Sequence, residues 1–152
     1  MRKRNINLTN DNQLIEIIED SEYNIIYVGS ENSDLKARIQ IVHKLPNLKS
    51  RINIKSIVLN NAKFDLEGIL KIEKGAYNTD TYLKIECLIV GDNAYARAIP
   101  SLEIKESAVK GGHGATIGYI DQNQLDYLYS KGLDKITSEN LLISGFIGKE
   151  ID

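Results

Sequence analysis

The chain has 152 residues, of which 42% are hydrophobic and 26% charged, with a formal net charge of -2 at pH 7. This length suits one domain with one core, and no clustered Lys and Arg are available to displace counterions from nucleic acid. No apolar run is long enough to span a bilayer, and the basic N-terminus lacks the apolar stretch of a secretory signal. We therefore expect a cytoplasmic protein without membrane or nucleic-acid partners.

Short strands with alternating polarity are predicted from about residue 5 to residue 117, interrupted by Gly- and Asn-rich turns. Helical periodicity is weak there and is confined to residues 12–19. The segments Lys71–Tyr77 and Leu88–Ala94 both run from an apolar stretch through a glycine turn to an alanine, roughly 16 to 18 residues apart. This spacing favours a β-solenoid slightly over a β-sandwich, and both alternatives stay open at this point.

Cys87 is the single cysteine, which excludes an internal disulfide and a four-cysteine zinc site. Strand alternation places Cys87 on one face with Leu83 and Ile85, so we expect a buried, inert thiol. Leu88 and Val90 fall on the opposite face and predict an exposed apolar strip that could contact another subunit.

A glycine-rich stretch from Gly111 to Gly118 surrounds His113, a side chain that binds metals or carries a proton near neutral pH. Glu103 and Glu106 lie nearby in sequence as candidate supporting carboxylates. The chain has no phosphate-binding Gly-Lys-Ser/Thr loop, no Gly-x-Ser-x-Gly elbow and no His-Glu-x-x-His motif, so the motifs of ATPases and hydrolases are absent from it.

Two helices are predicted at the end of the chain. The first is capped by Asp121, with Gln124 three residues later, and ends at Gly132. The second begins after Asp134 or Thr137 and carries two apolar ridges, Leu142 with Phe146 and Ile143 with Ile147. One ridge can pack on the sheet and the other on the first helix or on a partner.

Several of these segments, taken in order, resemble the carboxy-terminal signature of the SufB/SufD proteins of iron-sulfur cluster assembly. They are His113–Gly118, Ile120–Asp121, Gln124–Leu125, Tyr127–Leu128, Ser130–Asp134 and Leu141–Phe146. Upstream segments, including Pro100–Ile104, resemble the β-helix core of the same family. The resemblance covers about residues 34 to 150.

The resemblance implies a right-handed parallel β-helix, or single-stranded β-solenoid, over residues 1–118 and an α-helical subdomain over 119–152. It implies a scaffold rather than an enzyme, with β-helices that pair in a homodimer or in a heterodimer with a SufB/SufD homologue. The helical subdomain would dock a SufC-like ABC ATPase. The residues expected to bind that ATPase are Leu125, Leu128, Tyr129, Leu142, Ile143, Phe146 and Ile147.

By the same resemblance, His113 is the expected metal ligand at the cluster site. Further candidates come from the residues themselves: Glu103 and Glu106 by their proximity in sequence, and Cys87 as the only thiol. An iron-sulfur cluster would be transient and shared between subunits. The chain looks like a short SufD-like member without the amino-terminal region, with Gly111 where many members have cysteine and Ile85 near the cysteine position of SufB. The alternative is a cluster-free interaction or regulatory module. A carbohydrate-acting β-helix enzyme would need exposed paired carboxylates that the sequence does not reveal.

Overall fold

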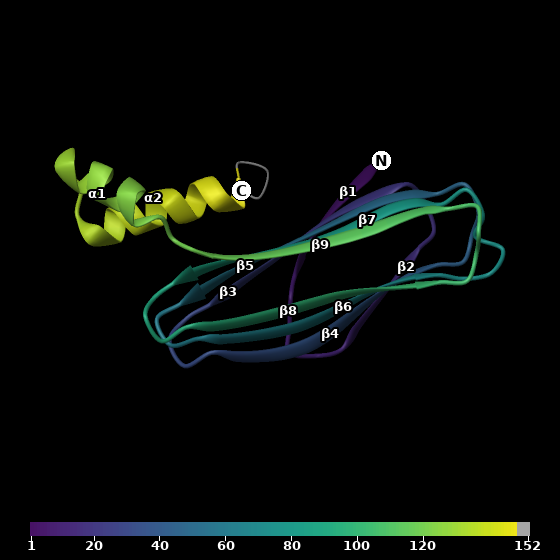
Figure 1. Ribbon diagram of the computed structural model, residues 1–152, viewed down its shortest axis with the longest axis horizontal. Helices are drawn as coiled ribbons and strands as arrows, with labels where there is room; N and C mark the ends of the chain where they lie inside the picture. The colour runs from purple at the N-terminus through teal and green to yellow at the C-terminus, as the bar shows by residue number, and fades with distance from the viewer. Residues whose placement is uncertain (149–152) are drawn as a thin grey trace.

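A computed structural model describes residues 1–148, which form strands followed by two helices (Figure 1). The elements are β1 (Arg2–Asn7), β2 (Gln13–Ile17), β3 (Ser21–Gly29), β4 (Asp34–His43), β5 (Lys49–Leu59), β6 (Lys63–Ile72), β7 (Asp80–Val90), β8 (Tyr95–Ile104), β9 (Lys110–Tyr119), α1 (Gln122–Ser130) and α2 (Lys135–Ile147). The weakly helical segment around residues 12–19 is mostly strand β2, because its side chains pack in the pleated register of β4.

The strands form two parallel sheets, in the orders β1-β3-β5-β7-β9 and β2-β4-β6-β8, and the chain changes sheet after every strand. This is a parallel β-helix, which confirms the predicted solenoid and excludes the sandwich. From β3 onward, stacked positions are 29 to 32 residues apart, whereas Arg2 pairs with Ser21 and Gln13 with Ile39 in the shorter first coil. The expected repeat of 16 to 18 residues is wrong as a coil length. Each coil contains one strand of each sheet, and the repeat measures only the distance from the turn after one strand to the turn after the next.

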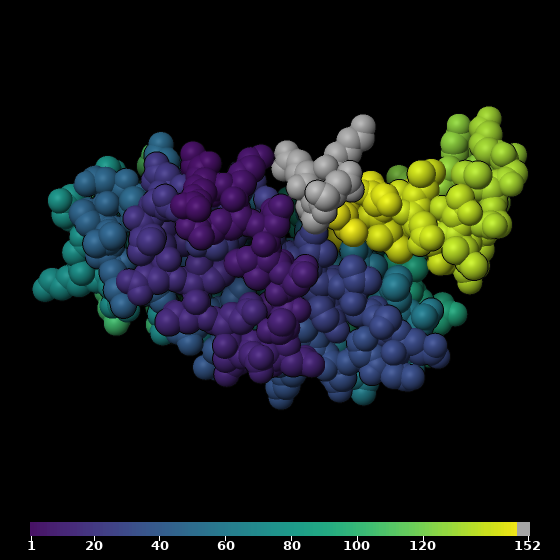
Figure 2. All heavy atoms as spheres, turned by 180° about the vertical axis from the view of Figure 1, so that it is seen from behind, coloured from purple at the N-terminus to yellow at the C-terminus, as the bar shows by residue number. Residues whose placement is uncertain are grey.

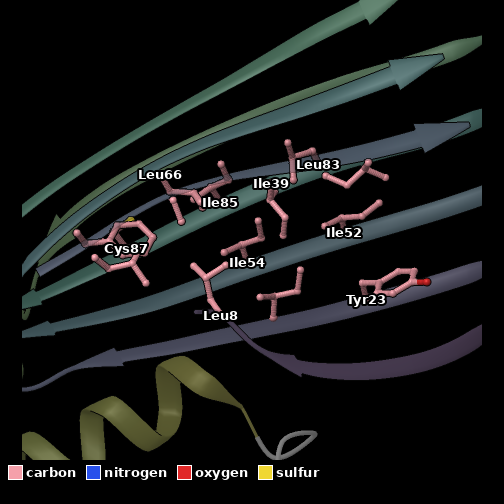
Figure 3. Packing of buried hydrophobic residues seen from close by; sticks show 14 of the residues in the cluster. Leu8, Tyr23, Ile39, Ile52, Ile54, Leu66, Leu83, Ile85 and Cys87 are labelled. Atoms are coloured by element: carbon pink, nitrogen blue, oxygen red, sulfur yellow. The ribbon is translucent and has the colours of Figure 1, made fainter. Parts of the chain in front are cut away.

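The lumen is filled by columns of apolar side chains, because residues in register on stacked strands point to the same face. Ile25, Ile54 and Ile85 form one such column, and each is fully buried. Figure 3 shows the core side chains gathered between the two layers of strands. Truncating one of them, as in Ile54→Ala, should lower the free energy of unfolding by about 2–5 kcal/mol.

Asparagines hold the turns in register. Asn60 and Asn78 have positive φ angles of 53° and 57°, which asparagine tolerates better than most residues. The Asn78 side-chain amide donates to Asn47 Oδ1 at 2.9 Å in the previous coil. Gly91, with φ 145°, leaves no room for a side chain, because a Cβ atom there would lie 2.6 Å from the backbone nitrogen of Asn60.

The two helices begin where the sequence predicts. Asp121 accepts a hydrogen bond from the Asn123 N–H, and Asp134 accepts one from the Thr137 N–H, so both are N-caps. Gly132 follows α1 with a φ of 86°, as expected for a residue that ends a helix. Within residues 1–148, neither helix combines the length and apolarity needed to cross a membrane.

The helices form a lobe at one end of the strands, seen clearly from behind in Figure 2. The Lys55 ammonium on the outer face of β5 donates to the Phe146 carbonyl at 2.8 Å and lies 5.4 Å from the Phe146 ring centre. Lys55 therefore caps the C-terminal end of α2 with a positive charge. The predicted subdomain of residues 119–152 includes this lobe, and its residues 149–152 lie outside the described part of the chain.

The expected exposed strip of Leu88 and Val90 is largely covered by the chain itself. Val90 is buried and lies beside Leu125 and Tyr129 of α1, and Leu88 is half-buried on β7, which α2 contacts. The prediction of an exposed strip is wrong for Val90, because alternation along a strand does not show which other element of the chain covers its outer face.

Candidate functional site: the C-terminal end of the β-helix

The β-helix ends in two edge strands, β8 and β9, each paired with the chain on one side only within residues 1–148. The N–H of Lys110 donates to the Thr79 carbonyl, and the N–H of Ile120 donates to the Ile89 carbonyl. Even-numbered residues of β9 therefore face β7. In a parallel ladder, the odd-numbered residues then direct their N–H and C=O groups away from β7, toward the open edge.

The edge of β8 differs because it contains Pro100. The Tyr95 N–H donates to the Ala62 carbonyl just before β6, and the Lys105 N–H donates to the Ile72 carbonyl at the end of β6. The even-numbered residues of β8 therefore face the open edge. Pro100 occupies one of these positions and offers no donor there. Strand addition is thus obstructed at β8 and unobstructed at β9, where no proline occurs.

His113 lies near the middle of this open edge. It pairs in register with Leu83, whose side chain is fully buried in the lumen, so His113 lies on the lumen side of the last coil. In the described part of the chain no further coil covers it, and its side chain is exposed. Ala115 and Ile117 continue the same row above Ile85 and Cys87.

Cys87 is buried, as the alternation predicts. Burial raises the pKa of its thiol, an effect that the nearby Ser56 hydroxyl opposes only weakly, so the neutral thiol is favoured. Cys87 lies below Ile117, four residues along the strand from the position that pairs with His113. At about 3.3 Å per residue, Cys87 and His113 are about 13 Å apart along the strand, too far to share one metal ion.

Glu103 and Glu106 have local structural partners. Glu103 lies on the outer face of β8, and its carboxylate is 3.4 Å from Lys71 Nζ. The Glu106 carboxylate accepts hydrogen bonds from the backbone N–H groups of Gly75 and Ser107, both at 3.0 Å. The Gly75 bond is the main cause of its lowered pKa. The fold does not bring these carboxylates into a common cluster with His113.

Within residues 1–148, no three His, Cys, Asp or Glu side chains come close enough to hold a metal ion. At the two positions where the family resemblance suggests cysteines, Gly111 has no side chain and Ile85 is buried in the core. A cluster handled at this end would therefore need ligands from outside this chain.

The other histidine, His43, is fully buried, and its contacts fit a structural role. Its Nε2 atom is 2.8 Å from Ser50 Oγ, which in turn is hydrogen-bonded to Thr81 Oγ1. Burial lowers the pKa of His43, so its neutral form is favoured. This polar row ends below Gly111, the residue that pairs with Thr81 in the last coil.

The helical lobe offers a second candidate surface. Of the residues expected to bind a partner, Leu125 is buried, Tyr129 is 36% exposed, and the rest are half-buried. An apolar groove between the helices is lined by Asn123, Gln124, Tyr127, Leu128 and Leu142. The most exposed apolar side chains of the lobe are Ile136, Tyr127 and Leu141, which are not among the predicted partner-binding residues.

Comparison with known proteins gives a consistent result. Residues 4–146 match the family model described as "SUF system FeS cluster assembly, SufBD core domain". Two iron-sulfur cluster assembly SufBD family proteins of Mycobacterium tuberculosis are similar, one 30% identical over 108 residues and the other 29% identical over 140 residues. These alignments cover 71% and 87% of this chain but only 13% and 35% of the relatives.

A third relative is the iron-sulfur cluster assembly SufBD family protein ycf24 of Porphyra purpurea, 28% identical over 107 residues, or 70% of this chain and 22% of the relative. The chain thus spans about a third or less of the length of the relatives it matches. The matched region nevertheless includes nearly all of the β-helix and most of the helical lobe. This chain belongs to the SufBD family, whose role is in iron-sulfur cluster assembly.

Proposed function

We propose that this protein is a SufB/SufD-like scaffold of iron-sulfur cluster assembly that pairs with a second β-helix through β9 and docks a SufC-like ABC ATPase through its helical lobe. The observation that carries the proposal is the open edge of β9, with unpaired backbone groups beside the exposed His113. Pairing of two such edges satisfies these groups and brings residues of two chains to one lumen end.

Pairing is proposed at β9 rather than at β8, and proline substitution tests this choice. Ala115 and Ala98 are small residues at corresponding lumen-side positions of the two edge strands, and both direct their N–H groups outward. Ala115→Pro should weaken the dimer about tenfold or more, because each chain loses one hydrogen-bond donor at the interface. Ala98→Pro should leave the dimer intact. Analytical ultracentrifugation of the full chain measures both, and equal effects would contradict pairing through β9.

Docking of the ATPase is supported by the exposed apolar side chains of the helical lobe. A charge placed there should abolish association with a SufC-like ATPase in a pull-down. Leu141→Asp provides the test, because Leu141 is 53% exposed on α2. Leu14→Asp is the matched control, since Leu14 is 66% exposed on the distant strand β2. If both variants bind the ATPase as the wild type does, docking through this surface is refuted.

In the proposed scaffold, the cluster is cargo, held by His113 together with ligands from a partner chain. His113→Ala should keep dimerisation and ATPase association while lowering the iron content of client proteins in cells that depend on this scaffold. The second candidate function is a cluster-free interaction or regulatory module. It is favoured by the absence of a complete ligand group within residues 1–148. Unchanged client loading in His113→Ala would select the module.

A further inference from the structure

The strand that carries His113 has few side chains on its outer face. Gly112, Gly114 and Gly118 all lie on that face, since they alternate with the lumen-side residues of β9. Glycine weakens a strand because it adds backbone entropy and packs against nothing. An edge strand of this composition needs another contact to hold it in place.

Tyr82 of β7 supplies that contact. A Cβ atom built on Gly112 would lie 2.9 Å from Tyr82 Cδ2, and one built on Gly114 would lie 2.9 Å from Tyr82 Oη. The ring therefore lies along β9 and fills the space that two side chains would take. These two glycines flank His113 in the sequence. At Gly118, by contrast, a Cβ atom would meet nothing within 4 Å.

We propose that Tyr82 is a positioning residue for His113: its ring packs on Gly112 and Gly114 and fixes the part of β9 that presents the histidine to a partner chain. Aromatic side chains that cover glycine in a neighbouring strand are a known means of ordering sheet edges. Only the purpose given to this contact, presenting His113 to a partner chain, rests on the proposed function. The contact between Tyr82 and the two glycines stands on geometry alone.

A cycle of double variants tests the contact through hydrogen exchange of the β9 amides in the full chain. With Tyr82 present, Gly112→Ala should speed exchange at β9, because the new methyl group displaces the ring. With Tyr82→Ala, the same substitution should slow exchange, because alanine restricts the unfolded strand more than glycine does. Gly118→Ala is the matched control and should change the exchange rate of the β9 amides in the same direction in both backgrounds. If Gly112→Ala changes the exchange rate in the same direction with and without Tyr82, the contact is refuted.

The positioning role has a separate readout. Tyr82→Ala should speed exchange of the β9 amides about tenfold and broaden the imidazole resonances of His113, whereas Tyr82→Phe, which keeps the ring, should preserve both. Unchanged His113 resonances in Tyr82→Ala would overturn positioning by Tyr82. The proposed function fails in a different way. If client loading is insensitive to His113→Ala, the cluster role is lost while the coupling of Tyr82 to Gly112 remains.

Discussion

The two ends of the β-helix treat an inward-facing histidine in opposite ways. At the N-terminal end, strand β2 lies over His43, with Ile17 in register above it, and both side chains are fully buried. At the C-terminal end, β9 presents His113 without a covering strand among residues 1–148. Figures 1 and 2 view the molecule from these two sides. The contrast teaches that a lumen-facing histidine in this fold is accessible to other molecules only in a terminal coil, because a further strand stacked on it buries its side chain.

The ends also differ in charge. Arg2 and Arg4 of β1 lie on the lumen side of the first coil and pair with the Glu19 carboxylate at 3.2 and 2.8 Å. The Arg4 guanidinium also lies 5.9 Å from the centre of the Tyr23 ring. Inward-pointing charges of this kind discourage edge-to-edge association. The lumen row of β9 contains no Lys, Arg, Asp or Glu, which leaves that end the better candidate for pairing.

The largest expected difference between the ends is in packing, and a pair of isoleucines measures it. Ile17→Ala should lower the free energy of unfolding by about 2–5 kcal/mol, because the side chain is fully buried. Ile117→Ala should lower it by only about 1 kcal/mol, because Ile117 is 45% exposed at the open end. Urea unfolding of both variants in the Ala115→Pro background excludes dimer effects. Equal losses in this background would mean that Ile117 is packed as tightly as Ile17 within the single chain.

Because His43 is buried, it should also make the free energy of unfolding depend on pH. Its folded-state pKa is lowered from 6.5 by burial, so the unfolded chain binds a proton more readily than the folded chain does. The free energy of unfolding should therefore fall as the pH drops below about 6.5, by at most about 1.4 kcal/mol per pH unit, and should be fully restored above it.

The His43 effect is measured by urea unfolding between pH 5 and 7.5, with His113→Ala present in every sample so that no other histidine titrates. His43→Gln in this background removes the titrating group and should flatten the profile over the same range. A profile equally steep with and without His43 would show that another group causes the pH dependence.

Local signals predicted the local parts of this fold. The caps at Asp121 and Asp134 were predictable because a capping side chain bonds to a backbone N–H two or three residues away. The coil length was not, because stacked residues are separated by a full coil and the turns between strands vary in length. The spacing of apolar segments records only the distance from one turn to the next.

The site shows the same division between local and distant information. Alternation correctly placed Cys87 in the lumen, and the glycines marked the strand of His113 as unusual. The partner of Glu106 was not predictable, because the Gly75 N–H that it accepts from lies 31 residues earlier. The contact of Tyr82 with Gly112 also joins neighbouring coils. Contacts of this kind become visible only when the register of the coils is known.

The smallest expected effect is at the charged N-terminal end. Hydrogen bonding to Arg4 is the main cause of the lowered pKa of Glu19, so the ion pairs stabilise the fold above about pH 4.5 and are lost as the pH falls through the lower folded-state value. Glu19→Gln should speed exchange of the β1 amides only a few-fold at pH 7, because exposed ion pairs contribute little. The variant and the wild type should converge once the pH lies below the lowered folded-state pKa of Glu19, and β9 should exchange alike in both. A difference that persists in acid would mean that Glu19 acts through packing rather than charge.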